Sequence, residues 1–264
     1  MTTGSDISLT RITELVKEAK TFFFNKEMQH DVHVKGPIDF VTEVDYHVQA
    51  YLQEALRKEY PDVQFMGEEK NNDDIDFSGL VWILDPVDGT ANLVHDLHAS
   101  AISLGLCDNG TNVLGVIYNP YTDELFSARK DGGAFLNGKP LRVTKAPDLA
   151  HSMVIVGTSS NHREQTAWTF DVFEEIFNRS EDIRLNGSAA VSLSDVARGR
   201  YGALFQRYLM PWDFAAGQVI IQEAGGVLAD FDGKPLPCDR PSSVLAAANE
   251  KILQEMLEIV QKEY

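Results

Sequence analysis

The segment WILDPVDGTANLVH at residues 82–95 places two carboxylates, Asp85 and Asp88, directly after an apolar run. The apolar run is typical of a buried strand, and Pro86 followed by Asp88-Gly89 predicts that this strand ends in a turn. Carboxylates at such a strand end can bind a divalent cation. Alternatively, Asp88 and Thr90 simply cap a turn or the next helix. This segment alone leaves both interpretations open.

Other acidic residues also lie at the ends of predicted elements. Glu68 and Glu69 follow a short apolar run and a glycine, Asp45 lies near the start of a predicted helix, and Asp213 stands at the head of another. Each has an ordinary explanation, because acids near a helix start interact favourably with the helix dipole. If they converge, however, they form an oxygen-only ligand set without Cys or His, which favours Mg²⁺ or Mn²⁺ over zinc.

The chemistry that such a set could support is phosphate ester hydrolysis. Divalent ions can activate water, orient a phosphoryl group and stabilise the leaving oxygen. The backbone N–H groups of Gly89 and Thr90, at a predicted helix start, could bind phosphate oxygens. The residues therefore predict a metal-dependent phosphatase.

The composition limits the partners. The chain has 264 residues, 44% of them hydrophobic, and a formal net charge of −17 from 40 acidic and 23 basic residues. Such a charge repels nucleic acids and anionic membranes, so we expect neither as a partner. Cys107 and Cys238 lie in apparently unrelated segments and are expected to be reduced thiols. A charged N-terminal pattern and the lack of a long apolar run predict a cytoplasmic location.

The periodicity of the apolar residues predicts the elements that must position the acids. Helices are predicted at 7–24 and 43–57, and strands at 63–66, 80–84, 100–107, 112–118 and 124–129. Tight turns are predicted at Asn109-Gly110 and Asn137-Gly138. After residue 150, strands at 153–156 and 201–205 alternate with helices at 165–177, 191–198, 213–224 and 250–263.

This pattern predicts two lobes in one α+β or α/β chain. Residues 1–145 would form an N-terminal lobe, in which two helices cover a mostly antiparallel sheet that carries most of the metal ligands. Residues 146–264 would form an α/β lobe that carries Asp213 and the loops on the substrate side.

Three separated motifs resemble the inositol monophosphatase family of Mg²⁺-dependent, lithium-sensitive phosphatases: GEE at 67–69, DPVDGTANLVH at 85–95 and WDFAAG at 212–217. DFVTEVD at 39–45, GGAFLNGKPLRV at 132–143 and GSAA at 187–190 support the resemblance. It implies a layered α-β-α-β-α sandwich of the inositol monophosphatase and fructose-1,6-bisphosphatase type. It also implies a homodimer, a small phosphorylated substrate, and two to three Mg²⁺ ions, for which Mn²⁺ could substitute.

The resemblance assigns roles to individual residues. The metal ligands would be Glu68, Asp85, the carbonyl of Val87, Asp88 and Asp213. The catalytic residues would be Glu68, Thr90 and Asp45, with Asp45 orienting Thr90 so that it positions the attacking water. The substrate-binding residues would be Asp88, Gly89, Thr90, Gly187, Ser188, Ala189, Gln206 and Asp213. The reaction would be an in-line attack of water without a phosphoenzyme.

One departure from the family pattern leaves the substrate open. Gln206 stands where inositol phosphatases usually carry a glutamate that contacts substrate hydroxyls. The amide is uncharged and both donates and accepts hydrogen bonds. An inositol phosphate or similar polyol or sugar phosphate is expected, with a 2′- or 3′-phosphate of NADP(H) or a nucleotide, or fructose 1,6-bisphosphate, as alternatives.

Two other kinds of protein are also considered. A haloacid-dehalogenase-type phosphatase has a D-x-D-G-T motif, but here the two aspartates are three residues apart. A non-catalytic, regulatory protein-binding relative would keep the fold without turnover. A turnover assay with Mg²⁺ separates the second from an enzyme.

Overall fold

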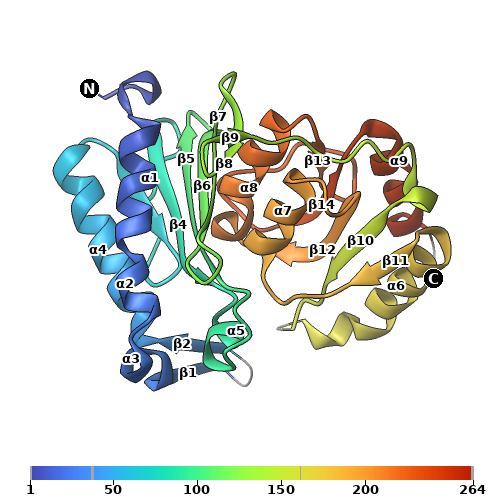
Figure 1. The fold of residues 1–264 in the computed structure, drawn as a ribbon, viewed down its shortest axis with the longest axis horizontal. Helices are drawn as coiled ribbons and strands as arrows, with labels where there is room; N and C mark the ends of the chain where they lie inside the picture. Colours follow the sequence, from blue (N-terminus) through green and yellow to red (C-terminus); the bar gives the residue numbers. More distant parts are fainter. Residues whose placement is uncertain (1, 37–38, 161, 263–264) are drawn as a thin grey trace.

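Five alternating layers of helices and sheets make up the fold (Figure 1). The computed structural model describes residues 2–36, 39–160 and 162–262. Helices α1 (Leu9–Glu18) and α4 (Glu43–Glu59) cover the outer face of a seven-stranded sheet. Helices α7 (Ala189–Ala197) and α8 (Pro211–Glu223) lie between this sheet and a five-stranded one, and α6 (Thr166–Arg179) and α9 (Glu250–Val260) cover its far face. The expected α-β-α-β-α sandwich is confirmed.

The seven-stranded sheet has its strands in chain order, and only its first pair is parallel. Its strands are β3 (Gln64–Gly67), β4 (Leu80–Asp88), β5 (Ala101–Asp108), β6 (Thr111–Asn119), β7 (Glu124–Arg129), β8 (Gly133–Leu136) and β9 (Lys139–Pro140). The predicted tight turns join β5 to β6 and β8 to β9, with Asn109, Gly110, Asn137 and Gly138 all at positive φ. Asn and Gly tolerate this backbone region better than other residues.

The five-stranded sheet is mixed, with strand order β11-β10-β12-β14-β13. Its strands are β10 (Met153–Gly157), β11 (Asp182–Arg184), β12 (Ala203–Leu209), β13 (Val227–Ala229) and β14 (Ser242–Ala247). The remaining elements are a hairpin of β1 (Val32–Gly36) and β2 (Asp39–Thr42), the short helices α2 (Lys20–Phe23), α3 (Lys26–His30) and α5 (Thr90–Val94), and 3₁₀ turns at Gly4–Asp6, Leu149–His151 and Arg163–Gln165.

Strand β4 corrects the prediction that Pro86 ends the strand. Asp85 pairs with Ser103 and Asp88 with Ala101, so two residues of β4 oppose one residue of β5 in a bulge. Pro86 lies inside this bulge, where its missing N–H costs no ladder hydrogen bond. Residues three apart in a regular strand point to opposite faces. The bulge changes this alternation, and both aspartates face the same cavity.

The first predicted helix also needs correction. Instead of one helix over 7–24, α1 ends at Glu18, and α2 follows after Ala19. A third helix then begins after Asn25, whose side chain accepts hydrogen bonds from the backbone N–H groups of Glu27 and Met28. This N-terminal cap starts α3 as a helix separate from α2.

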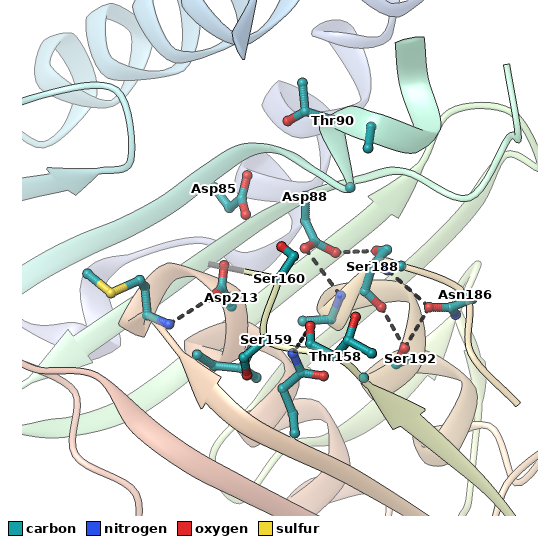
Figure 2. Close-up of a pocket in the computed structure, with 18 of the residues that line it drawn as sticks. Asp85, Asp88, Thr90, Thr158, Ser159, Ser160, Asn186, Ser188, Ser192 and Asp213 are labelled. Carbon is teal, nitrogen blue, oxygen red and sulfur yellow. Dashed lines mark hydrogen bonds between the residues drawn. The ribbon is translucent and has the colours of Figure 1, made fainter. Parts of the chain in front are cut away.

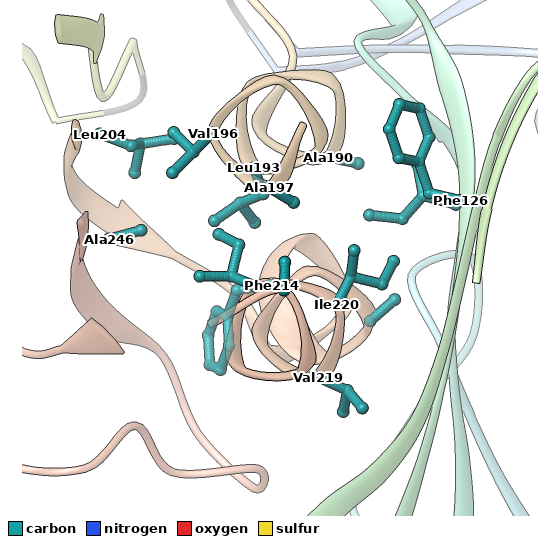
Figure 3. Packing of buried hydrophobic residues seen from close by; sticks show 14 of the residues in the cluster. Phe126, Ala190, Leu193, Val196, Ala197, Leu204, Phe214, Val219, Ile220 and Ala246 are labelled. Carbon is teal, nitrogen blue, oxygen red and sulfur yellow. The ribbon is translucent and has the colours of Figure 1, made fainter. Parts of the chain in front are cut away.

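Helices α7 and α8 are packed between the sheets in a shared apolar core (Figure 3). Leu193 and Val196 of α7 and Phe214 and Ile220 of α8 are almost fully buried there. Helix α8 comes very close to the seven-stranded sheet, because a β-carbon on Gly115 of β6 would collide with the carbonyl group of Ala216. The predicted division at residue 145 falls between the sheets, but the helices pack against both, so the two-lobe description stays a prediction.

The two cysteines are free and buried, but they are not in unrelated places. The Cys107 thiol on β5 donates a hydrogen bond to the Cys238 sulfur at 3.0 Å, across 131 residues of sequence. Both belong to a small apolar cluster with Ala215 of α8. In the described part of the chain, no helix combines the length and the apolar character that a membrane crossing requires.

Candidate active site

A cavity of about 560 Å³ opens where several element ends converge (Figure 2). The end of β4 and the start of α5 line it on one side, and the starts of α7 and α8 with the ends of β10 and β12 line it on the other. The elements that form its walls therefore come from both sheets and from the helix layer between them. The volume is within the range of small-ligand sites in proteins.

Three carboxylates form the acidic part of the cavity. Oxygen atoms of Asp85, Asp88 and Asp213 all lie within 4.8 Å of one another. Burial, followed by the negative charges of Glu68, Asp88 and Asp213, raises the pKa of Asp85 well above its usual range. Burial also raises the pKa of Asp88, and burial together with Asp88 raises the pKa of Asp213 to about 7. In the protein alone, burial and mutual repulsion therefore favour protonation of part of the cluster.

This cluster fits a divalent cation of the Mg²⁺ type. Its donors are carboxylate oxygens, the ligands that hard cations prefer. A positive ion among them would remove the repulsion that raises their pKa values. Val87 and Glu68 also line the cavity, so the residues of the predicted ligand set lie together.

Asp88 is held by the start of α7. The Ser188 hydroxyl donates to its Oδ2, and the N–H groups of Ala190 and Ala189 donate to Oδ2 at 2.7 Å and to Oδ1 at 3.2 Å. These hydrogen bonds lower the pKa of Asp88 and oppose part of the effect of burial. A carboxylate at a helix N-terminus is also stabilised by the helix dipole. The contact fixes β4 against α7 across about 100 residues of sequence.

Asp213 and Asp45 occupy equivalent positions in their helices. Each is the third residue of its helix and accepts a hydrogen bond from the backbone N–H of the residue before the helix: Met210 to Asp213 at 2.7 Å, and Thr42 to Asp45 at 2.8 Å. In both cases Oδ2 makes this cap. The other oxygen can face the site. A role in helix capping is therefore compatible with a role in the site for both acids.

Asp45 is linked to the cavity through Thr90. The Thr90 hydroxyl lies 3.2 Å from Oδ1 of Asp45 and 3.0 Å from the carbonyl oxygen of Val87. Burial raises the pKa of Asp45 to about 6, although hydrogen bonds from Thr42 oppose the rise. At neutral pH the carboxylate is therefore largely ionised and can accept the Thr90 proton. The lone pairs of the hydroxyl oxygen then remain for another donor.

The structure brings the predicted site residues together. Glu68, Asp85, Val87, Asp88, Gly89, Thr90, Gly187, Ser188, Ala189, Gln206 and Asp213 all line the cavity. Asp45 does not line it and lies behind Thr90. Glu69 is near Asp45 and contributes to its raised pKa, and its backbone N–H donates to Gln49.

Several cavity residues were not predicted. Asn92 donates to the carbonyl groups of Ala99 and Asn186, both at 2.8 Å, and so connects α5 to the loop before α7. Thr158, Ser159, Ser160, His162, Asn186, Ser192 and Tyr208 also line the cavity. Tyr208, an aromatic residue of a type that usually packs in a core, is 40% exposed at the cavity. Only its position two residues after Gln206 on one strand could have suggested this.

Comparison with known proteins gives one consistent result. The sequence matches the model of the inositol monophosphatase family over residues 5–263. It is 35% identical to an inositol-1-monophosphatase of Rhizobium meliloti over 239 residues, which cover 90% of this chain and 89% of the relative. It is 37% identical over 199 residues to the Nus factor SuhB of Escherichia coli, with 75% of this chain and 74% of the relative covered.

Solved structures agree over nearly the whole chain. A Thermotoga maritima IMPase is 31% identical, with a TM-score of 0.84 and 96% of both chains covered. SaIMPase-II was solved with inositol monophosphate (32%, TM-score 0.81, 95% of this chain and 93% of the other) and with 2′AMP (31%, 0.78, 95% of both). An IMPase/NADP phosphatase complexed with Mg²⁺ and phosphate is 25% identical, with a TM-score of 0.85 and 97% of both chains covered.

Proposed function

The chain belongs to the inositol monophosphatase family, and we propose that it is a Mg²⁺-dependent hydrolase of small phosphate monoesters. The observation that carries this proposal is the group of three carboxylates whose oxygens lie within 4.8 Å of one another at the base of the cavity. A phosphoaspartate route of the haloacid dehalogenase type is disfavoured by the family to which the chain belongs.

We propose that Glu68, Asp85, the Val87 carbonyl, Asp88 and Asp213 hold two to three Mg²⁺ ions, with Mn²⁺ as a substitute. Bound divalent ions would neutralise phosphate charge and lower the pKa of water at this place. The Mg²⁺ and phosphate in the IMPase/NADP phosphatase structure support this assignment. Because the net charge of −17 repels a phosphate at long range, positive ions at the site would favour its binding.

Thr90 and Asp45 orient the attacking water in this proposal. The ionised Asp45 accepts the proton of the Thr90 hydroxyl, so the Thr90 oxygen accepts a hydrogen bond from water. This holds the water with a lone pair directed toward the phosphorus. The N–H groups of Gly89 and Thr90 bind phosphate oxygens, since the first N–H groups of α5 have no partner within their helix.

The start of α7 has a positioning role. Ser188 and Ala189 were predicted to bind substrate, and in the structure they also hold Asp88. We propose that they fix Asp88 while Gly187 and Asn186, on the same loop, leave space for the substrate beside it.

The substrate is proposed to be inositol monophosphate or a similar polyol phosphate, as for the relatives with that name. A nucleoside 2′-phosphate is the second candidate, because SaIMPase-II binds 2′AMP. Fructose 1,6-bisphosphate and NADP fit less well. The described residues that line the cavity include no Lys or Arg to bind a second phosphate group.

A regulatory, protein-binding role is a separate candidate, and the similarity to Nus factor SuhB favours it. It does not replace the enzymatic proposal, because every acid of the expected ligand set is present and lines the cavity. A cytoplasmic location, a homodimer and lithium sensitivity remain predictions from the sequence.

The test is phosphate release from a panel of phosphate monoesters by purified protein stripped of metal and then supplied with Mg²⁺. We expect no turnover without the ion, recovery with Mg²⁺, and no effect of a chelator that binds zinc but only weakly Mg²⁺. Full activity in the metal-stripped protein would refute the mechanism. A lack of turnover with every substrate in Mg²⁺ would favour the regulatory role.

A further inference from the structure

Two aromatic rings lie together on the substrate side of the cavity. His162 comes from the loop after β10, and Tyr208 comes from β12, near Gln206; all three line the cavity. The ring centroids of His162 and Tyr208 are 4.2 Å apart, and the rings are inclined by 53°. At this distance the two rings pack against each other and form a corner, and a flat ligand can stack on a ring face that the other ring does not cover.

The rings are accessible, unlike aromatic residues of the core. Tyr208 is 40% exposed, and the His162 side chain is 34% exposed. The His162 backbone N–H donates to the Ser159 carbonyl at 2.9 Å, and its Nδ1 lies 3.3 Å from the Glu164 carboxylate. His162 is therefore held by local hydrogen bonds, and both side chains keep exposed surface at the cavity.

The charges around the corner disfavour a ligand that carries a second phosphate group. Among the described residues that line the cavity, none is Lys or Arg. Arg207 is next to Tyr208 in sequence, but its guanidinium group lies 4.1 Å from the centre of the Trp168 ring on α6, away from the cavity lining. The described lining therefore offers no Lys or Arg to a second phosphate, and the Glu164 carboxylate, 3.3 Å from Nδ1 of His162, adds a negative charge beside the corner.

We propose that His162 and Tyr208 form a nucleobase-binding corner through which the enzyme also accepts nucleoside 2′-monophosphates, beside the polyol phosphates of the proposed function. The inference rests on the proposed phosphatase function and adds the residues that decide between its substrate classes. The single phosphate lies at the carboxylate cluster, and the base stacks on the two rings. A polyol phosphate has no flat ring and gains little from this corner.

The experiment compares wild-type protein with Tyr208→Ala, His162→Ala and the ring-retaining Tyr208→Phe. Phe177→Ala is the matched control, because Phe177 is an aromatic side chain 53% exposed on α6 outside the cavity. For each variant, kcat/KM is measured in Mg²⁺ with 2′-AMP and with inositol 1-phosphate. The dissociation constant of adenosine is measured by calorimetry, which does not depend on turnover.

Loss of a stacked base should lower kcat/KM for 2′-AMP by about five- to a hundredfold in Tyr208→Ala. The value for inositol 1-phosphate should change less than about threefold, and adenosine binding should weaken by a factor similar to that for 2′-AMP. Tyr208→Phe and Phe177→Ala should both resemble the wild type. His162→Ala should change in the same direction as Tyr208→Ala.

Equal losses with both substrates, or unchanged adenosine binding in Tyr208→Ala, would overturn the inference. Failure of the underlying function gives a different result. If wild-type protein hydrolyses neither substrate, the phosphatase proposal fails, whereas adenosine binding that depends on Tyr208 would still support the corner.

Discussion

Asp213 and Asp45 each use one carboxylate oxygen for a helix cap and have the other available for a second contact. Asp213 caps α8 through Oδ2 and also hydrogen-bonds Asp85. Asp45 caps α4 in the same manner and reaches Thr90 through Oδ1. The cap fixes the side-chain rotamer, so the second oxygen is held in place without a separate support. A carboxylate at a helix start can therefore cap the helix with one oxygen and be available as a ligand through the other.

Asp213→Asn should separate these two roles. The amide oxygen can still accept from the Met210 N–H, while the removed charge relieves repulsion from Asp88. We expect the metal-free variant to be at least as stable as the wild type and turnover to fall about a hundredfold or more. Phosphate release and urea unfolding in EDTA measure the two effects. Asp171→Asn, on the exposed side of α6, is the control; near wild-type turnover in Asp213→Asn would refute its assignment as a ligand.

Thr90 can be tested by a change that keeps its shape. Thr90→Val removes the hydroxyl that lies 3.2 Å from Asp45 and should lower kcat about a hundredfold or more, with the fold retained. Thr90→Ser keeps the hydroxyl and should stay within about tenfold of the wild type. Steady-state kinetics at saturating Mg²⁺ measure both. Near wild-type turnover in Thr90→Val would show that the hydroxyl does not position the attacking water.

Helix α8 connects the apolar core to the site. Its first turn carries Asp213, and its next turn lies against β5 and β6 at Gly105 and Gly115. The close approach depends on the lack of a side chain at these positions. The packing of α8 therefore sets the distance between Asp213 and the aspartates of β4.

Gly115→Ala should disturb this distance. The added methyl group would collide with backbone atoms of Ala216, which can move only with the helix. We expect a loss of about 1–3 kcal/mol in the free energy of unfolding and a higher Mg²⁺ concentration for half-maximal activity. Urea unfolding and Mg²⁺ titration measure these changes.

Gly79→Ala is the matched control for Gly115→Ala, because nothing lies within 4 Å of the added carbon there. Its unfolding free energy should change by less than about 0.5 kcal/mol. If Gly115→Ala were as stable and as active at low Mg²⁺ as this control, the proposed link between α8 packing and the site would be wrong.

The stability of the protein as a whole should report the charge state of the site. Burial raises the pKa values of Asp85, Asp88 and Asp213, the last to about 7, above an unfolded value near 4. Between these pH values the folded protein binds more protons than the unfolded chain. The free energy of unfolding of metal-free protein therefore falls as pH rises through this range. Divalent ions bind the ionised carboxylates, so their stabilising effect should grow over the same range.

Thermal melts in EDTA and in millimolar Mg²⁺ test this linkage. The gain in Tm from Mg²⁺ should be larger at pH 8 than at pH 5, by about 4 °C or more. The difference between the two conditions cancels the general repulsion of an acidic surface. In Asp213→Asn the gain should be smaller at both pH values. An equal gain at pH 5 and pH 8 in the wild type would show that the ion does not bind through these carboxylates.

Local sequence determined the features that depend on neighbours along the chain. The Asn-Gly turns at 109–110 and 137–138 follow from the backbone preferences of Asn and Gly. Most strands of the seven-stranded sheet follow from apolar periodicity, and Asp45 and Asp213 could be placed at helix starts from cap patterns. The family motifs also identified the cavity acids, because such motifs mark residues that lie together in the folded members of the family.

Tertiary structure alone decided what meets across the chain. Pro86 lies in a bulge because β5 pairs on both sides of it, and local turn chemistry therefore gave the wrong end for β4. The contact of Cys107 with Cys238 and that of Asp88 with Ser188 join residues at least 100 positions apart. Tyr208 resembles a packing residue by type, and only the fold shows that it lines the cavity and lies against His162. Such contacts depend on how the layers of the fold pack. The apolar periodicity of one segment indicates which of its faces is buried, but not which element packs against that face.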